Sequence, residues 1–182
     1  MLHQSSLFNG KTLANQEAEK SYLIETIEDH TRGKITRTIC LYTFDYLNKV
    51  NFHKYFDNHE NIVLLVRLKS GVIVAGYSEG AFYPKVISDR DGLLMTLTYQ
   101  NAFELKTPNK RAITYDDYYI IFGNSEVRIK AGEAKLFTNF GISNSFYDHR
   151  GVKVNGFIGE GDEREVATAT YEIYELEFED MA

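Results

Sequence analysis

The chain is predicted to be mainly β (α+β), a two-sheet antiparallel β-sandwich with flanking N-terminal helices. Tyr and Phe supply 13 and 12 of its 182 residues and Trp is absent, so residue types that favour strands fill much of the interior. Short β-branched or aromatic runs recur between Gly, Asn and Asp turns. No regular helices separate these runs, which disfavours βαβ units and a parallel sheet.

The predicted helices come first along the chain. Within residues 13–30 an apolar face recurs at helical spacing, formed by Ala18, Tyr22, Leu23 and Ile27. This spacing predicts an amphipathic helix with Asn15 as its N-cap and Gly33 just beyond its end. Residues 48–57 return to helical spacing and predict a short second helix.

The remaining apolar runs predict strands. Their ranges are 37–43, 62–68, 72–77, 93–99, 103–106, 111–114, 118–122, 126–130 and 165–179. Gly71 separates the second run from the third, and it can take the positive φ that a tight hairpin needs. In the last run the apolar residues change face after Tyr174, so we expect a bulge or twist near Glu175.

Composition and charge exclude several classes of function. The formal net charge is −6 and no stretch is dominated by Lys or Arg, so we expect no direct nucleic-acid binding. The one cysteine, Cys40, lies in an apolar run, which predicts a buried core thiol in a reducing compartment. Neither a signal peptide nor a run long enough to span a bilayer is evident, which predicts a soluble cytoplasmic protein.

One stretch, HKYFDNHE, brings together three potential metal ligands, His53, Asp57 and His59. Helical spacing places His53 and Asp57 on one face but turns His59 away, so a metal site requires the helix to end at Asn58. The same residues are ordinary helix-cap and turn chemistry. We therefore expect a solvated helix end and no metal site.

Other motifs fail on spacing. In FGNSEV, Val127 stands where a nucleophile elbow needs its second Gly, which places Ser125 in a hairpin. In SDRDG, the twelfth position counted from Asp89 is Gln100, where a calcium loop needs Glu. Acidic residues surround the glycines of GFIGEGDERE (156–165) and would repel a phosphate, so we expect a solvent loop or a partner-contacting loop. The sequence predicts no active site and no cofactor.

Five segments, taken in order, resemble the TLDc domain family. They are LLVRLKSGVIVAGY, GLLMTLTYQNAFELK, AITYDDYYIIFGNSEVRIK, LFTNFGISNSFY and ATYEIYELEFED. The upstream LFNGKTLANQEAEKSYLIETI resembles the helical entry of that family. The resemblance covers residues 7–179, which leaves residues 1–6 as a short tail. The chain departs from the family at Ala75, where a Gly often lies, at Phe178 in a tail without Trp, and in a longer loop before Val166.

The TLDc resemblance implies a β-sandwich with flanking helices and a role in resistance to oxidative stress. Several members of the family bind and regulate the vacuolar-type proton ATPase (V-ATPase), and the family has no agreed active site. We therefore expect a non-catalytic interaction module that binds the V-ATPase soluble sector. The alternative is a structural subunit of a large cytoskeletal or ciliary assembly. A redox-protective enzyme is disfavoured because Cys40 is the only thiol and lies among apolar neighbours.

Aromatic, polar and acidic residues in loops are the candidate partner contacts. They are Tyr77, Phe82, Tyr83, Asn139, Phe140, Ser145, Phe146, Tyr147, Glu160 and Asp162. Loop aromatics beside Gly and Asn often anchor interfaces. The alternative, which we favour, is that these side chains close the ends of the sandwich.

Overall fold

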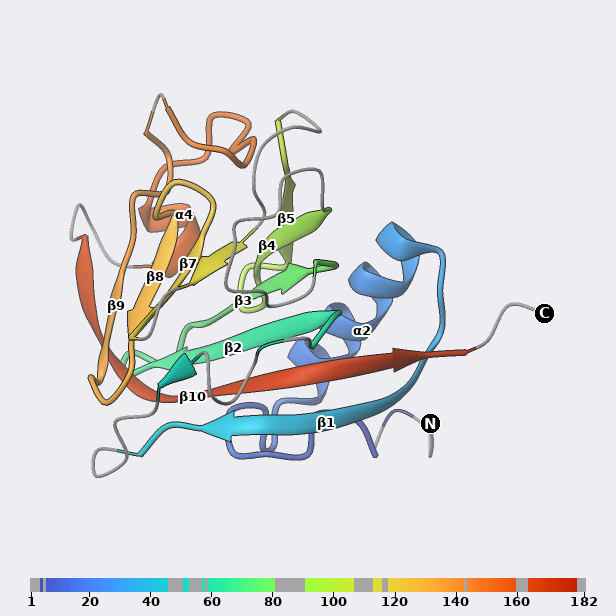
Figure 1. Ribbon diagram of the computed structural model, residues 1–182. Helices are drawn as coiled ribbons and strands as arrows, with labels where there is room; N and C mark the ends of the chain where they lie inside the picture. The colour runs from blue at the N-terminus through green and yellow to red at the C-terminus, as the bar shows by residue number, and fades with distance from the viewer. Residues whose placement is uncertain are drawn as a thin grey trace.

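The computed structural model describes residues 4, 6–45, 51–52, 57, 59–80, 91–106, 113–115, 118–142, 144–159 and 164–179 (Figure 1). In these residues the helices are α2 (Glu17–Thr31) and α4 (Asn155–Ile158). The strands are β1 (Ile35–Thr43), β2 (Ile62–Leu68), β3 (Ile73–Ser78), β4 (Gly92–Thr96), β5 (Asn101–Glu104), β6 (Ile113–Tyr115), β7 (Tyr119–Phe122), β8 (Val127–Lys130), β9 (Lys135–Phe137) and β10 (Glu165–Phe178). The fold is therefore mainly β.

The strands of the described residues pair antiparallel in one continuous sheet. Its order is β5-β4-β3-β2-β10-β9-β8-β7-β6, and β1 also pairs with β10. The C-terminal part of β10 pairs with β1 and β2, and its N-terminal part pairs with β9. We call β1–β5 with the C-terminal part of β10 the large sheet, and β6–β9 with its N-terminal part the small sheet. Figure 1 shows β10 curving from one to the other.

The two sheets pack face to face over one apolar core. Their approach is close, since a Cβ added to Gly76 of the large sheet would lie 2.6 Å from the Phe122 ring of the small sheet. A second core lies on the other side of the large sheet, where Leu23, Ile24 and Ile27 of α2 are buried. The predicted β-sandwich with a flanking helix is confirmed as three layers: α2, the large sheet and the small sheet.

Helix α2 forms in the predicted region, but its start and its buried face differ from the prediction. Ala18 is exposed, and Ile24 is buried although the predicted face omitted it. Asn15 has a φ of 60° and Gln16 is the N-cap residue, so the predicted N-cap is wrong. The N–H of Gln16 donates to the carbonyl of Leu13 at 3.1 Å, and Leu13 is buried. This docked turn delays the start of the helix.

The β2–β3 hairpin has the predicted turn. Gly71 has a φ of 97°, and its N–H donates to the carbonyl of Leu68 at 2.9 Å. Both strands are buried along nearly their whole length, because the large sheet is covered on both faces. Leu64 faces the small sheet and its neighbour Leu65 belongs to the core beneath α2. Two covered faces explain why this run is apolar throughout instead of alternating.

The irregularity expected near Glu175 is present in the pairing of β10 with β1, where the register shifts at Leu41, opposite Tyr174 and Ile173. Glu175 itself stays paired with both β1 and β2, and the pairing with β2 shifts at Ala169. Beyond that bulge both faces of β10 are buried. Tyr174 and Leu176 consequently lie on one face, in the core beneath α2. The apolar residues pass from the core between the sheets, at Tyr171 and Ile173, to the core beneath α2, at Leu176 and Phe178, because β10 is covered on both sides.

Two short elements were not predicted, namely the three-residue strand β9 and the single turn α4. Both are too short to show a periodic pattern. Most of the helix predicted over residues 48–57 lies outside the described residues. None of the helices in the described part of the chain has the length and apolar character that crossing a membrane requires.

Candidate functional site

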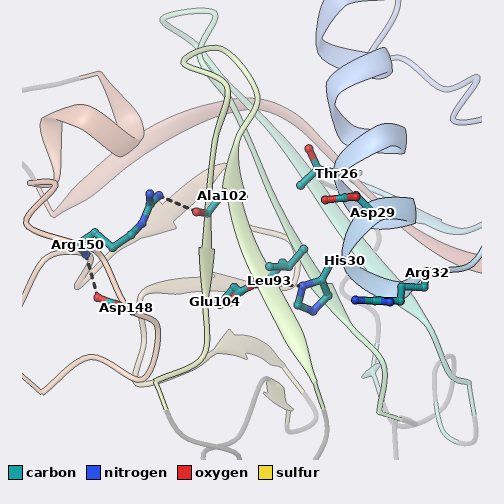
Figure 2. A pocket seen from close by; sticks show the side chains of 9 residues that line it. All are labelled: Thr26, Asp29, His30, Arg32, Leu93, Ala102, Glu104, Asp148 and Arg150. Atoms are coloured by element: carbon teal, nitrogen blue, oxygen red, sulfur yellow. Dashed lines mark hydrogen bonds and ion pairs between the residues drawn. The ribbon is translucent and has the colours of Figure 1, made fainter.

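An open, charged cleft of about 540 Å³ lies between the end of α2 and the strand β5. Its lining consists of Thr26, Asp29, His30, Arg32, Leu93, Ala102, Glu104, Asp148 and Arg150. Figure 2 shows that these side chains come from three segments: the end of α2, the β4–β5 hairpin and the loop that precedes α4. We call this site the α2–β5 cleft. Charges of both signs line it, and these segments lie far apart in the sequence.

Helix α2 presents its last turn to the cleft because its opposite face is buried. Ile27 is part of the core beneath the helix. The Thr31 hydroxyl closes the helix by donating to the Ile27 carbonyl at 2.8 Å, and Arg32 then takes a left-handed φ of 59°. His30 and Arg32 thus lie at the C-terminal end of the helix, where the helix dipole favours positive charge.

His30 joins three elements at the cleft. Its Nε2 lies 2.5 Å from Asp91 Oδ2, and its Nδ1 lies 3.4 Å from Glu104 Oε1. The His30 side chain is 14% exposed, whereas the two carboxylates are 47% and 73% exposed. The imidazole therefore links the end of α2 to the residue before β4 and to β5. A ring protonated on both nitrogens can donate to both carboxylates.

Arg150 is held against β5 by several contacts. Its own N–H donates to Asp148 Oδ1 at 3.0 Å, and its backbone has a φ of 51°. Its guanidinium donates to Asn101 Oδ1 at 2.5 Å. It also donates to the Ala102 carbonyl at 2.8 Å, as Figure 2 shows. The same group lies 5.1 Å from the centroid of the Phe103 ring. These contacts fix Arg150 and shape one wall of the cleft.

A buried carboxylate, Glu126, positions the loop that leads into the cleft. Its Oε1 accepts the N–H of Asn124 at 2.7 Å, and its Oε2 accepts the N–H groups of Phe146 and Tyr147 at 3.0 and 2.9 Å. Burial raises the pKa of Glu126, and these backbone donors oppose that effect. Sequence analysis missed this residue. The sequence signal that could have identified Glu126 is its position: it is a Glu at the start of an apolar strand, directly after the turn that holds Ser125.

The candidate partner contacts differ in burial. The buried members are Tyr77, Phe140, Ser145 and Tyr147, and the partly exposed members are Asn139 and Phe146. The others, Phe82, Tyr83, Glu160 and Asp162, lie outside the described residues. Phe140 stacks on Phe157 with ring centroids 4.4 Å apart, and the Tyr77 hydroxyl donates to Asn61 Oδ1 at 3.0 Å. Tyr77, Phe140 and Tyr147 are thus buried in the interior, while partner binding by the set stays a prediction.

The structure also places the other motifs. Ser125 has a φ of 63° in the β7–β8 turn, which confirms the predicted hairpin. His59 Nδ1 lies 3.1 Å from Glu175 Oε2, whereas His53 and Asp89 lie outside the described residues. In the part of the chain that the structure describes, no group of three or more His, Cys, Asp or Glu side chains is arranged to hold a metal ion.

Cys40 is exposed, so the predicted core thiol is wrong. It lies in β1, which pairs with β10 alone in the described residues and is mostly unburied. Its Sγ lies 3.5 Å from the Tyr42 carbonyl and from the Thr43 hydroxyl. An apolar run at the edge of a sheet can leave a side chain in solvent, which the sequence pattern alone does not reveal.

A search of protein-family models finds no match to this chain, and a search of the curated proteins finds none either. The TLDc resemblance therefore stays a prediction.

Proposed function

We propose that the chain is a non-catalytic protein-interaction module that docks on a large soluble assembly through the α2–β5 cleft. One observation carries the proposal: the cleft presents charges of both signs on a wall whose key side chains are already fixed. His30 is held by two carboxylates, and Arg150 is held by β5. Fixed charges lose little side-chain entropy when a partner binds.

The shape and chemistry of the cleft fit an interface better than a small-molecule site. Pockets for small ligands are mostly apolar and enclosed, with a few polar groups that orient the ligand. This cleft is open, and most of its lining side chains are charged or polar. Glu104 and Asp91 keep much of their surface exposed beside it. Complementary charges across an interface provide specificity and register.

The TLDc resemblance provides the partner class. The expected partner is the soluble sector of the V-ATPase, with a regulatory role that supports resistance to oxidative stress. A structural subunit of a cytoskeletal or ciliary assembly is the alternative, since such a role uses the same rigid sandwich. A redox-protective enzyme is the third hypothesis. The exposure of Cys40 removes one argument against it, but the chain has a single cysteine and therefore cannot form an internal disulfide.

Arg32 allows a specific test of the cleft. It is exposed, and its side chain makes no hydrogen bond or ion pair with the described residues, so Arg32→Glu reverses a charge without breaking a side-chain contact. Lys69→Glu in the exposed β2–β3 turn is the matched control, because it reverses a charge outside the cleft lining. Tagged wild-type chain and both variants are incubated with extract of the native cells, and the captured proteins are quantified by mass spectrometry.

The proposal expects the wild type and Lys69→Glu to capture V-ATPase soluble-sector subunits equally. Arg32→Glu should capture at least about tenfold less of these subunits than the wild type does, because the reversed charge meets a like charge on the partner. Equal capture by all three proteins would remove the cleft from the interface. Capture of tubulin or other assembly proteins without the ATPase would favour the structural alternative, and failure to capture any assembly would contradict the interaction role.

A further inference from the structure

The outward face of the small sheet carries a row of side chains that the α2–β5 cleft does not use. Strand register places Arg128 of β8 between Ile121 of β7 and Phe137 of β9. The alternate residues, such as Ile129 and Leu136, are buried in the core between the two sheets. Arg128 and its neighbours therefore lie on the opposite face, farthest from α2. We call this the Arg128 face.

Two aromatic rings hold the Arg128 guanidinium in place. Its Cζ lies 4.2 Å from the centroid of the Phe137 ring and 5.6 Å from that of Tyr119. A guanidinium that rests on rings is attracted by their π-electrons and has fewer conformations to lose on binding. Arg128 is thus preorganised on this sheet.

The donors of Arg128 are not used within the described residues, where no carboxylate or carbonyl accepts from this side chain. Arg150 also lies over a ring, but it donates to Asn101 and Ala102. Arg164 donates to the Phe140 carbonyl at 2.7 Å. Arg128 differs from these two because it is fixed on rings while its N–H fork is still available.

The surroundings indicate what would bind there. Lys130 lies 5.7 Å from the Tyr119 ring centroid and 3.7 Å from Glu133, and the exposed Lys135 lies in β9 beside it. Glu165 of β10, the register partner of Phe137, also lies on this face. The cations Arg128, Lys130 and Lys135 outnumber Glu133 and Glu165 there, which contrasts with the net charge of −6 of the whole chain. A guanidinium fork matches the two oxygens of a carboxylate. Nucleic acid is a poorer fit, because the guanidinium already covers the rings on which bases would stack.

We propose that the Arg128 face docks an extended acidic segment of a partner protein, with a Glu or Asp carboxylate bound by Arg128. A flat sheet surface suits an extended segment, since alternate side chains of such a segment point to one side. The apolar side chain of Ile121 lies beside Arg128 and offers contact area next to the charge. The inference rests on the proposed interaction role but not on the α2–β5 cleft, which lies on the other side of the sandwich.

A peptide of alternating Glu and Thr residues is the probe for this proposal. Its binding to the isotope-labelled full chain is followed through the arginine Nε–Hε resonances and the backbone amides. The proposal expects shifts at Arg128, Phe137 and Tyr119, and no binding of a peptide of alternating Lys and Thr. Arg128→Gln should weaken binding about tenfold or more, because it removes a charge-assisted bidentate contact. Arg37→Gln, at an exposed arginine of β1, should bind as the wild type does.

Two further variants keep the test decisive. Phe137→Leu retains the charge but removes the ring beneath it, so it should weaken binding to a smaller extent. Arg32→Glu in the α2–β5 cleft should leave peptide binding unchanged, which separates this proposal from the proposed function. Equal binding by Arg128→Gln, or shifts confined to the cleft, would overturn the proposal. Binding of oligothymidylate in preference to the acidic peptide would also overturn it.

Discussion

Glu126 has no exposed surface, yet its carboxylate accepts three backbone N–H groups. The amide of Glu126→Gln has one oxygen end and one nitrogen end, so at least one of those donors loses its acceptor. We expect the free energy of unfolding, measured by urea titration, to fall by about 1–3 kcal/mol. Glu126→Ala removes every acceptor and should cost more. A stability equal to that of the wild type would mean that the loop after β9 is held by other contacts.

The pH dependence of the free energy of unfolding, compared between the wild type and Glu126→Gln, tests the charge of Glu126. Burial raises its folded pKa above the ordinary value of about 4.3, so the folded state holds the proton more tightly than the unfolded state does. The contribution of Glu126 to stability is then fully present below the unfolded pKa and falls as pH rises through the folded pKa. The difference between wild type and Glu126→Gln should therefore be larger near pH ~4 than near pH ~7. A difference that grows with pH would contradict this sign.

Gly76 is the residue that lets the two sheets approach. A Cβ at this position would lie 2.6 Å from the Phe122 ring, which is fully buried and cannot move aside freely. Gly76→Ala should therefore lower the free energy of unfolding by about 1–3 kcal/mol through overpacking. Adding Phe122→Leu provides space for the new methyl group. If the clash is the cause, the double variant should lose less stability than the sum of the two single variants.

At the scale of elements, the segment before α2 docks on the large sheet through three backbone contacts, one of which runs from the N–H of Phe8 to the Thr38 hydroxyl of β1 at 2.9 Å. The N–H of Gly10 donates to the Tyr174 hydroxyl at 3.0 Å, and the N–H of Thr12 donates to Glu172 Oε1 at 3.0 Å. A Cβ on Gly10 would overlap the Glu172 carboxylate. Gly10→Ala should therefore release this segment, with faster amide exchange at Thr12 and faster proteolysis. The exposed Lys11→Ala is the control and should behave as the wild type does.

Elements with a clear period or a distinct turn were predictable from the sequence. The β2–β3 hairpin is one, because two apolar runs flank a Gly that takes a positive φ. The bulge at Ala169 was not predicted, because two covered faces remove the alternation from which register is inferred. The buried position expected for Cys40 failed for the opposite reason, since an apolar run at a sheet edge resembles a core strand.

At the scale of the whole molecule, the candidate sites could not be predicted because each combines segments distant in the chain. The α2–β5 cleft joins residues of α2, the β4–β5 hairpin and the loop that contains Arg150. The Arg128 face depends on the register of three strands, one of which the sequence did not reveal. Loop aromatics were singled out for their sequence neighbours, but three-dimensional packing buries Tyr77, Phe140 and Tyr147.

The sharing of β10 predicts how the molecule unfolds. This strand pairs with β1 and β2 in the large sheet and with β9 in the small sheet. Neither sheet can lose β10 without exposing the core between them, so the two sheets should unfold in one transition. Urea unfolding followed by far-ultraviolet and near-ultraviolet circular dichroism should give the same midpoint, and the slowest amides of β2 and β8 should report the same free energy of opening. An earlier transition confined to β6–β9 would show that the small sheet opens by itself while β10 stays paired in the large one.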